Sequence, residues 1–130
     1  SLHLAKELNE RCSQAAKVMP ILLEVNVSGE GSKHGFTPET AAEAMKSFFD
    51  FPQLELRGLM TMAPITNEPE TSRPIFRNLR ILKDKISQRF PRLSMKHLSM
   101  GMSADYAIAI QEGATMLRIG TSIFGHRNTK

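Results

Sequence analysis

Hydrophobic positions along the chain alternate between two spacings, and this alternation predicts helices and strands in turn. Leu4, Leu8, Cys12 and Ala15 recur at the spacing of one helix face. A run of branched apolar residues then occupies 21–27. Such a run is typical of a buried strand, so the first two elements are expected to be a helix and a strand.

The same order repeats in the next segment. Thr37 followed by Pro38 predicts a second helix, because threonine caps a helix N-terminus well and proline fits the first helical position. This helix is expected to run to about Phe49, and a strand is expected over 54–62. The residues expected on the buried side of the helix are Ala42, Met45 and Phe49.

A long amphipathic helix is predicted next, and it is expected to end near Phe90 because Pro91 follows. Its apolar positions are Ile75, Leu79, Leu82 and Ile86. A strand over 95–100, a helix over about 104–112 and a strand from Thr115 complete the series.

Four strands alternating with helices, without hairpin turn signals, predict an α/β fold with a parallel sheet. Helices would cover one face of that sheet, which explains why the strands are nearly continuous apolar runs. Ligand sites of parallel folds gather at the carboxyl ends of the strands. Polar strand residues are therefore candidates for a site, and they are Glu24, Asn26, Arg57, Thr61, Ser99 and Arg118.

The composition restricts the class of protein. With 130 residues, of which 41% are apolar, the chain can bury one core and is expected to form a single domain over 1–130. The net charge of +4 is spread over amphipathic segments, and there is no Trp, so a nucleic-acid partner is not expected. No apolar run reaches membrane-spanning length, so no membrane partner is expected either.

Cysteine and histidine add little chemistry. A single cysteine, Cys12, cannot form an internal disulfide, and this fits a reducing cytoplasm as the location. The four histidines are too dispersed to show metal-ligand spacing, so no metal site is expected. They are His3, His34, His97 and His126.

The last third of the chain contains two candidate ligand-binding blocks. Residues 98–105 (LSMGMSAD) and 116–125 (MLRIGTSIFG) each predict a short strand that runs into a turn of small, hydroxyl-bearing residues. Two such turns side by side offer backbone N–H groups, hydroxyls and one arginine to a single phosphate group. Arg118 supports this interpretation, because an arginine inside an apolar strand needs a partner.

The first block also has a simpler interpretation. Ser103 would cap the helix over about 104–112, with Asp105 in its first turn and Gly113 as its stop. Gly101 would let the backbone approach a ligand. However, Ser-Ala-Asp before an apolar run is also typical of an ordinary helix start, so both interpretations stay open.

Four motifs together carry a family resemblance. They are ILLEVNVSGEGSKHGF at 21–36, LRGLMTM at 56–62, LSMGMS at 98–103 and LRIGTSIFG at 117–125. In this order they closely resemble the pyridoxal-phosphate homeostasis protein family. The resemblance implies a (β/α)8 barrel similar to the barrel domain of alanine racemase. It also implies a protein that binds pyridoxal 5′-phosphate (PLP) as a Schiff base and carries or buffers this cofactor, without established catalysis.

The resemblance further implies the residues of a cofactor site, with no catalytic residue among them. The phosphate would be held by the turn at Ser99, Met100 and Gly101, together with Gly120 and Thr121. Arg118 would face the pyridine nitrogen or lie close to the phosphate, and Met62 would pack near the ring. A cation at that nitrogen keeps it unprotonated, which suits a carrier better than a catalyst. The motif residues Lys33 and Arg57 receive no ligand contact.

The match covers strands five to eight of the family barrel. The chain is therefore expected to be the C-terminal half of a (β/α)8 barrel, with four parallel strands alternating with helices. The family's Schiff-base lysine lies in an Ala-Val-Ser-Lys-Thr type of motif on the first strand, and nothing here matches that motif. Covalent attachment in the family's manner is thus not expected, and Lys33 has no feature that would make it the replacement.

A half barrel exposes unpaired strand edges, and such edges pair with other chains. Two copies would close an eight-stranded barrel as a homodimer, or the chain is a fragment that associates with the missing half. Two further functions stay open beside the carrier. One is a racemase-like enzyme, which needs an acid–base pair that the only tyrosine, Tyr106, does not convincingly supply. The other is a structural half barrel with an idle phosphate site.

Overall fold

A computed structural model of the chain describes residues 1–31 and 34–125. Its four strands form one parallel sheet in the order β1-β2-β3-β4, which confirms the predicted alternation. Lys33 and His126 lie outside the described residues. The elements in chain order are α1 (Leu2–Gln14), β1 (Met19–Glu24), α2 (Pro38–Ala44), the 3-10 helix η1 (Met45–Asp50), β2 (Leu54–Met60), the 3-10 helix η2 (Pro69–Ser72), α3 (Arg73–Arg89), β3 (His97–Met102), α4 (Tyr106–Gln111), β4 (Met116–Arg118) and α5 (Thr121–Phe124).

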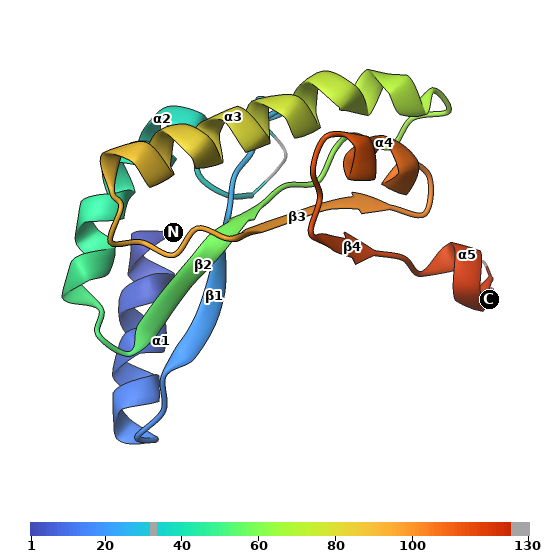
Figure 1. The fold of residues 1–130 in the computed structure, drawn as a ribbon. Coiled ribbons are helices and arrows are strands. Elements are labelled where there is room, and N and C mark those ends of the chain that lie inside the picture. Colours follow the sequence, from blue (N-terminus) through green and yellow to red (C-terminus); the bar gives the residue numbers. More distant parts are fainter. Residues whose placement is uncertain (32–33, 126–130) are drawn as a thin grey trace.

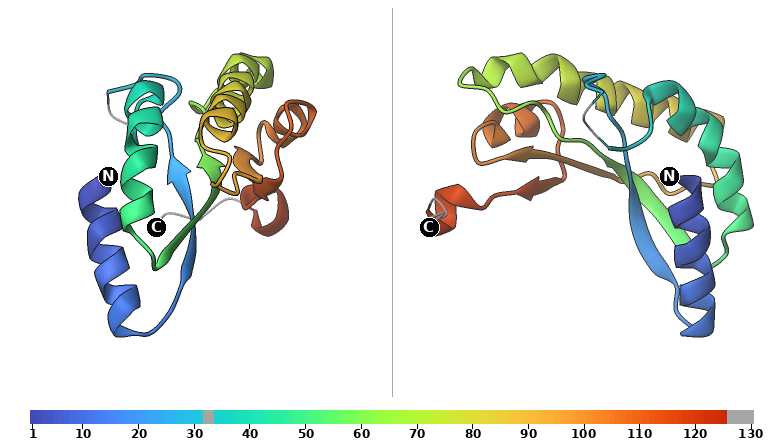
Figure 2. Two further views of the ribbon diagram at one scale, coloured as in Figure 1. Left: turned by 60° about the vertical axis from the view of Figure 1, so that its left-hand side comes forward. Right: turned by 180° about the vertical axis from the view of Figure 1, so that it is seen from behind.

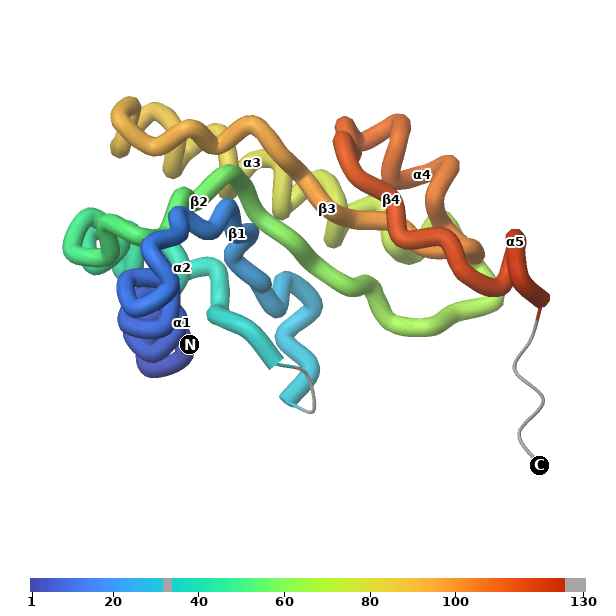
Figure 3. The backbone as a smooth tube through the Cα atoms, turned by 90° about the horizontal axis from the view of Figure 1, so that it is seen from below, coloured from blue at the N-terminus to red at the C-terminus, as the bar shows by residue number. Residues whose placement is uncertain are grey.

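The first four α-helices lie on one side of the sheet, and the other side carries none of them (Figures 1 and 2). Seen from below, the strands follow one another in chain order from β1 to β4 (Figure 3). We call the helix-bearing side the covered face and the opposite side the bare face. Within the described residues, no helix is long and apolar enough to cross a membrane.

Strand side chains alternate between the two faces, as a pleated strand requires, except at Arg57, where the register between β1 and β2 shifts by one residue. On the covered face, Leu56 and Leu59 of β2 are buried, and so are Leu98 and Met100 of β3. Their strand neighbours point to the bare face, where Leu22, Arg57, His97 and Met116 line a hollow of about 220 Å³. The core therefore lies between the sheet and the helices, and Arg57 and His97 lie opposite it.

The helix predicted from Thr37 is correct at its start and wrong in its second half. The Thr37 and Thr40 side chains form a reciprocal capping box, and Pro38 is the first helical residue. After Ala44, however, the chain tightens into η1. A 3-10 turn has three residues, so burial moves from the expected Phe49 to Phe48, three positions after Met45. Phe49 is 45% exposed.

The buried side of α1 also differs from the expected one. Ala5 and Cys12 are buried and Leu8 packs against the core, whereas Leu4 is 62% exposed. The packing face therefore follows positions 5, 8 and 12, one step around the helix from the predicted stripe. Leu4 instead lines an apolar hollow of about 760 Å³ beside the edge strand β1.

The longest helix, α3, packs its predicted apolar side onto the sheet. Phe76, Leu79 and Ile86 are buried, and Phe76 and Leu79 are fully inaccessible to solvent. Its arginines gather around one carboxylate at the end of α4, that of Glu112, which is 4% exposed. Arg77 donates to Glu112 at 2.8 Å.

Two more arginines complete this cluster, since Arg73 and Arg80 each donate to Glu112 at 3.2 Å. The hydrogen bond from Arg77, followed by those from Arg73 and Arg80, lowers the pKa of Glu112 to about 2, while burial opposes the shift. The cluster therefore joins α3 to α4 through an ionised carboxylate.

Two glycines are required by close packing between elements. A Cβ atom on Gly58 would lie 2.0 Å from the carbonyl oxygen of His97, so β2 and β3 approach closely there. Gly101 has a φ of +96°, and its Cβ would lie 2.5 Å from the Cβ of Ala109. Gly101 therefore lets α4 pack on β3, and its expected approach to a ligand stays a prediction.

Candidate functional site

The two turns predicted to bind phosphate lie side by side at the carboxyl ends of β3 and β4. Met102 pairs with Arg118 in the sheet, and this pairing brings the turn after β3 against the turn after β4. The hydroxyl oxygen of Ser103 accepts hydrogen bonds from the backbone N–H of Gly120 at 3.3 Å and of Ser122 at 3.2 Å. Two backbone N–H groups therefore converge on one hydroxyl oxygen, and N–H groups arranged in this way can bind an anion.

Ser103 does not cap α4, contrary to the prediction, and its hydroxyl instead binds the start of α5. The helix α4 begins at Tyr106, and Asp105 occupies its N-cap position. The carboxylate of Asp105 is buried, where it accepts from the backbone N–H of Met102 at 2.8 Å and from the hydroxyl of Ser72 at 3.0 Å. Asp105 therefore fixes the turn after β3, and this leaves the hydroxyl of Ser103 directed at the neighbouring turn.

Arg118 has the partners that an arginine inside a strand needs. Its Nη1 donates to the hydroxyl oxygen of Ser99 on β3 at 2.5 Å, and its Nη2 donates to the backbone carbonyl of Thr61 at 2.9 Å. Burial lowers the pKa of Arg118, while the nearby carboxylates of Glu24 and Asp105 raise it by smaller amounts. Arg118 is therefore a half-buried cation at the bare face, close to the paired turns.

The predicted site residues differ in what they offer to a ligand. The hydroxyl of Ser99 is bound to Arg118, and the side chain of Met100 is fully buried in the core, so Met100 has only its backbone for a ligand. Gly120 lies in the exposed turn after β4, and the exposed Thr121 is the first residue of α5. Met62 follows β2 and is 41% exposed.

Sequence reasoning missed two residues of this arrangement, Ser103 as a partner of the second turn and Thr61 as a partner of Arg118. For Ser103, the available signal was the pair of hydroxyl-rich turns on adjacent strands, combined with the expected parallel order. For Thr61, the contact is made by the backbone carbonyl, which no side-chain pattern reports.

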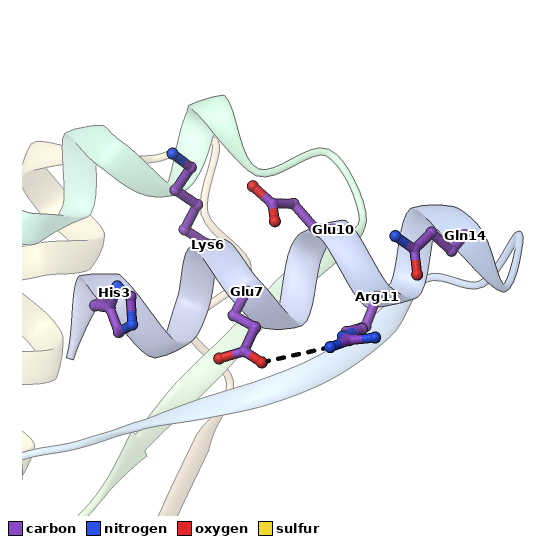
Figure 4. A pocket seen from close by; sticks show the side chains of 6 residues that line it. All are labelled: His3, Lys6, Glu7, Glu10, Arg11 and Gln14. Atoms are coloured by element: carbon purple, nitrogen blue, oxygen red, sulfur yellow. Dashed lines mark ion pairs between the residues drawn. The ribbon is translucent and has the colours of Figure 1, made fainter.

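Other features of the surface do not form a comparable site. A hollow of about 450 Å³ is lined only by six side chains of α1, including the Glu7–Arg11 ion pair at 3.9 Å (Figure 4). A groove along one helix face, without a strand end or loop, is an ordinary polar surface. Among residues 1–31 and 34–125, no group of three His, Cys, Asp or Glu side chains could hold a metal ion.

An open parallel β/α sheet with polar groups at its carboxyl edge is typical of α/β proteins, whose ligand sites lie at the ends of the strands. The model of the alanine racemase N-terminal domain matches residues 1–128. The chain belongs to this family.

Similar proteins agree in name and in fold. A pyridoxal phosphate homeostasis protein of Aquifex aeolicus is 43% identical over 125 residues, which are 96% of this chain and 54% of that protein. The solved structure of PipY from Synechococcus elongatus with PLP bound has a TM-score of 0.86 at 29% identity and covers 96% of this chain and 57% of PipY. The chain thus spans about half the length of the relatives it matches.

An alanine racemase of Clostridium difficile shares the fold, with a TM-score of 0.74 at 22% identity over 100% of this chain and 34% of that enzyme. Four parallel strands alternating with helices, matching about half of such barrel proteins, confirm the predicted fold class of a half (β/α)8 barrel. The family resemblance drawn from the four motifs is confirmed as well.

Proposed function

We propose that this chain binds PLP as part of a PLP homeostasis protein, and that it carries the cofactor without turning over a substrate. Its relatives from Aquifex aeolicus and Pasteurella multocida are named pyridoxal phosphate homeostasis proteins, and PipY has been solved with PLP bound. Because the chain spans about half of such proteins, this function belongs to the protein of which such a half barrel is a part.

The observation that carries the proposal is the convergence of donors on the hydroxyl of Ser103. The N–H groups of Gly120 and Ser122 point at one oxygen atom, and a phosphate oxygen near this position would accept from the same donors. These residues fit a phosphate group because they add donors and no carboxylate. Thr121 lies between the two donor residues, and its hydroxyl would complete the phosphate site.

Arg118 supports the second half of the proposal, in which the pyridine ring lies at the bare face. PLP supplies a reactive aldehyde on a ring that withdraws electrons most strongly when its nitrogen is protonated. A guanidinium cation beside the ring nitrogen disfavours that protonation, so Arg118 would keep the bound cofactor weakly reactive. Met62, exposed at the end of β2, would pack against the ring. This arrangement favours storage over catalysis.

The edges of the sheet favour association with further strands. In the described chain β1 pairs only with β2, and β4 pairs only with β3. Apolar side chains are exposed near both edges, with Met19 and Leu4 on one side and Met116, Ile123 and Phe124 on the other. A parallel barrel buries such edges, so we propose that a second copy, or the other half of a longer protein, covers them. The free thiol of Cys12 fits the cytoplasm as the location.

The first experiment is an absorbance titration of the folded chain with PLP, followed by borohydride reduction and intact mass. We expect saturable binding that inorganic phosphate reduces by competition, and no reduced adduct at a unique lysine. Absence of binding of either PLP or phosphate to a chain that is folded by circular dichroism would overturn the proposal. A single adduct on one lysine would overturn the expectation of non-covalent binding.

Association is tested separately by sedimentation velocity over a range of concentrations. We expect a dimer or a larger assembly, because isolated apolar edges are costly in water. A folded chain that stays strictly monomeric at all concentrations would contradict the association of two copies.

A further inference from the structure

Arg118 is held in place by neutral groups from two other strands. The acceptor on β3 is the hydroxyl oxygen of Ser99, which is only 5% exposed, and the acceptor after β2 is the backbone carbonyl of Thr61. Both terminal nitrogens of the guanidinium are bound at the same time. Rotation of this planar group about its last bond would break both hydrogen bonds, so its orientation is set before any ligand arrives.

Thr61 is itself fixed, which makes its carbonyl a dependable acceptor. It is fully buried, its hydroxyl donates to the carbonyl of Val25 at 2.7 Å, and its backbone N–H donates to the carbonyl of Ser99 at 3.1 Å. Val25, Thr61, Ser99 and Arg118 therefore form one continuous line of hydrogen bonds across the whole sheet. We call these four residues the cross-sheet line.

From this geometry we propose that Ser99 and Thr61 are positioning residues, which orient the Arg118 guanidinium toward the ring of bound PLP. The proposal rests on the proposed function. It assigns Ser99 to the support of Arg118, whereas the sequence predicted that Ser99 binds the phosphate. Binding is stronger when a charged group need not be ordered by the ligand, because the conformational cost is then met during folding.

The chemistry of the two partners agrees with this role. A hydroxyl and a carbonyl accept hydrogen bonds from a cation without cancelling its charge. The arginines at Glu112 are held by a carboxylate, which offsets part of their charge. These two hydrogen bonds of Arg118 use two of the five guanidinium N–H groups. They orient the guanidinium, which remains a cation.

The test compares Ser99→Ala with a control variant that also loses a hydroxyl, one that joins β3 to the residue just before β4. Thr115→Val is that control, because its hydroxyl accepts from the N–H of Leu98 at 2.9 Å, at the other end of the same strand pair. Affinities are measured for PLP, pyridoxal and inorganic phosphate. We expect Ser99→Ala to weaken PLP and pyridoxal by about three- to tenfold and phosphate by less than about twofold. Ser99→Thr, which keeps the hydroxyl, should restore the affinity for PLP.

Each outcome separates this proposal from the proposed function. If the wild-type chain binds neither PLP nor phosphate, both fail. If the wild type binds both ligands but Ser99→Ala and Thr115→Val lower PLP affinity equally, the function stands and the positioning role is wrong. Equal loss of PLP and phosphate affinity in Ser99→Ala would instead return Ser99 to the phosphate site.

A ligand-free measurement keeps the proposal testable if Ser99→Ala fails to fold. Nitrogen-15 NMR of the wild-type arginine side chains should show slow rotation and slow hydrogen exchange for the guanidinium of Arg118, and fast exchange for exposed Arg11. Fast rotation of the Arg118 guanidinium in the folded wild type would overturn the proposal.

Discussion

The covered face and the bare face of the sheet both hold arginines, but they hold them by different chemistry. On the covered face, Arg77 and Arg80 bind the buried carboxylate of Glu112, which offsets part of their charge. On the bare face, Arg118 is held by the hydroxyl of Ser99 and the carbonyl of Thr61, and the carboxylates of Glu24 and Asp105 act on its pKa by charge and less than burial does. A cation with an ionic partner serves folding, whereas an oriented cation with neutral partners is suited to a ligand.

The same contrast extends to burial. Next to the arginine cluster, Phe76 and Leu79 are fully enclosed between α3 and the sheet. Beside Arg118, the turn at Gly120 is exposed. Substitutions on the covered face should therefore change stability without a specific effect on binding, and substitutions at the site should do the reverse.

The largest expected effect is the loss of a core ring. Phe76→Ala should lower the free energy of unfolding by about 3–5 kcal/mol, because the cavity cannot fill without moving α3. Urea unfolding followed by circular dichroism measures this change. Phe49→Ala is the control, since Phe49 is 45% exposed and should cost much less. Equal losses would mean that the covered face is not the main source of stability.

At the site, Arg118→Ala should weaken PLP binding by about 10- to 100-fold, because it removes a charged hydrogen-bond donor. Its effect on the free energy of unfolding should be smaller than that of Phe76→Ala. The control is Arg77→Ala, which should leave PLP affinity unchanged while lowering stability. If Arg118→Ala is largely unfolded but its folded fraction binds PLP with unchanged affinity, Arg118 is a structural residue. The contrast between the covered face and the bare face would then be wrong.

The arginine cluster predicts a specific sensitivity to acid. The pKa of Glu112 is lowered from 4.5 to about 2, so its stabilising contribution is complete above pH 4.5 and is lost as the pH falls from 4.5 toward 2. Stability curves at several pH values should show this loss in the wild type. Glu112→Gln should be less stable at neutral pH and should show a weaker decline over the same range; an unchanged decline would assign the acid sensitivity to other carboxylates.

A smaller effect is expected at the start of α2, which follows β1 at its carboxyl end. Thr37→Ala removes one half of the capping box and should cost about 1 kcal/mol of stability, with PLP affinity unchanged. Ser87→Ala is a suitable control, because this hydroxyl donates to the carbonyl of Lys83 within α3 and caps no helix end. A change in PLP affinity of Thr37→Ala would extend the site to the β1 side of the sheet.

Much of the fold could be predicted because the spacing of hydrophobic residues in each element is typical of a helix or of a strand. The order of helices and strands, the parallel sheet and the end of α3 at Arg89 all follow from local patterns. The error at Phe49 arose because a 3-10 turn replaced the last turn of an α-helix, and the apolar residues of 45–49 are compatible with both. The free energy that decides between them comes from tertiary packing.

The site could be predicted only in part, because its contacts join distant positions. Arg118 was identified because a charge inside an apolar strand is unusual. Its partners Ser99 and Thr61 lie 19 and 57 positions away, and only the parallel register brings them together. Ser103 has a typical capping residue type, and its actual contact depends on the distance between two turns. The role of each site residue toward PLP stays a prediction.

The order of the strands also has a consequence for how the chain folds. Each strand pairs with the strand that precedes or follows it along the chain, so every pairing closes only one crossover through a helix. Closing such a crossover is slow compared with forming a local contact, but the pairings can form one unit at a time. During synthesis, β1 and β2 could therefore pair and bind α3 before Arg118 leaves the ribosome. The guanidinium of Arg118 would then join a sheet in which its acceptors on Ser99 and Thr61 are already in place.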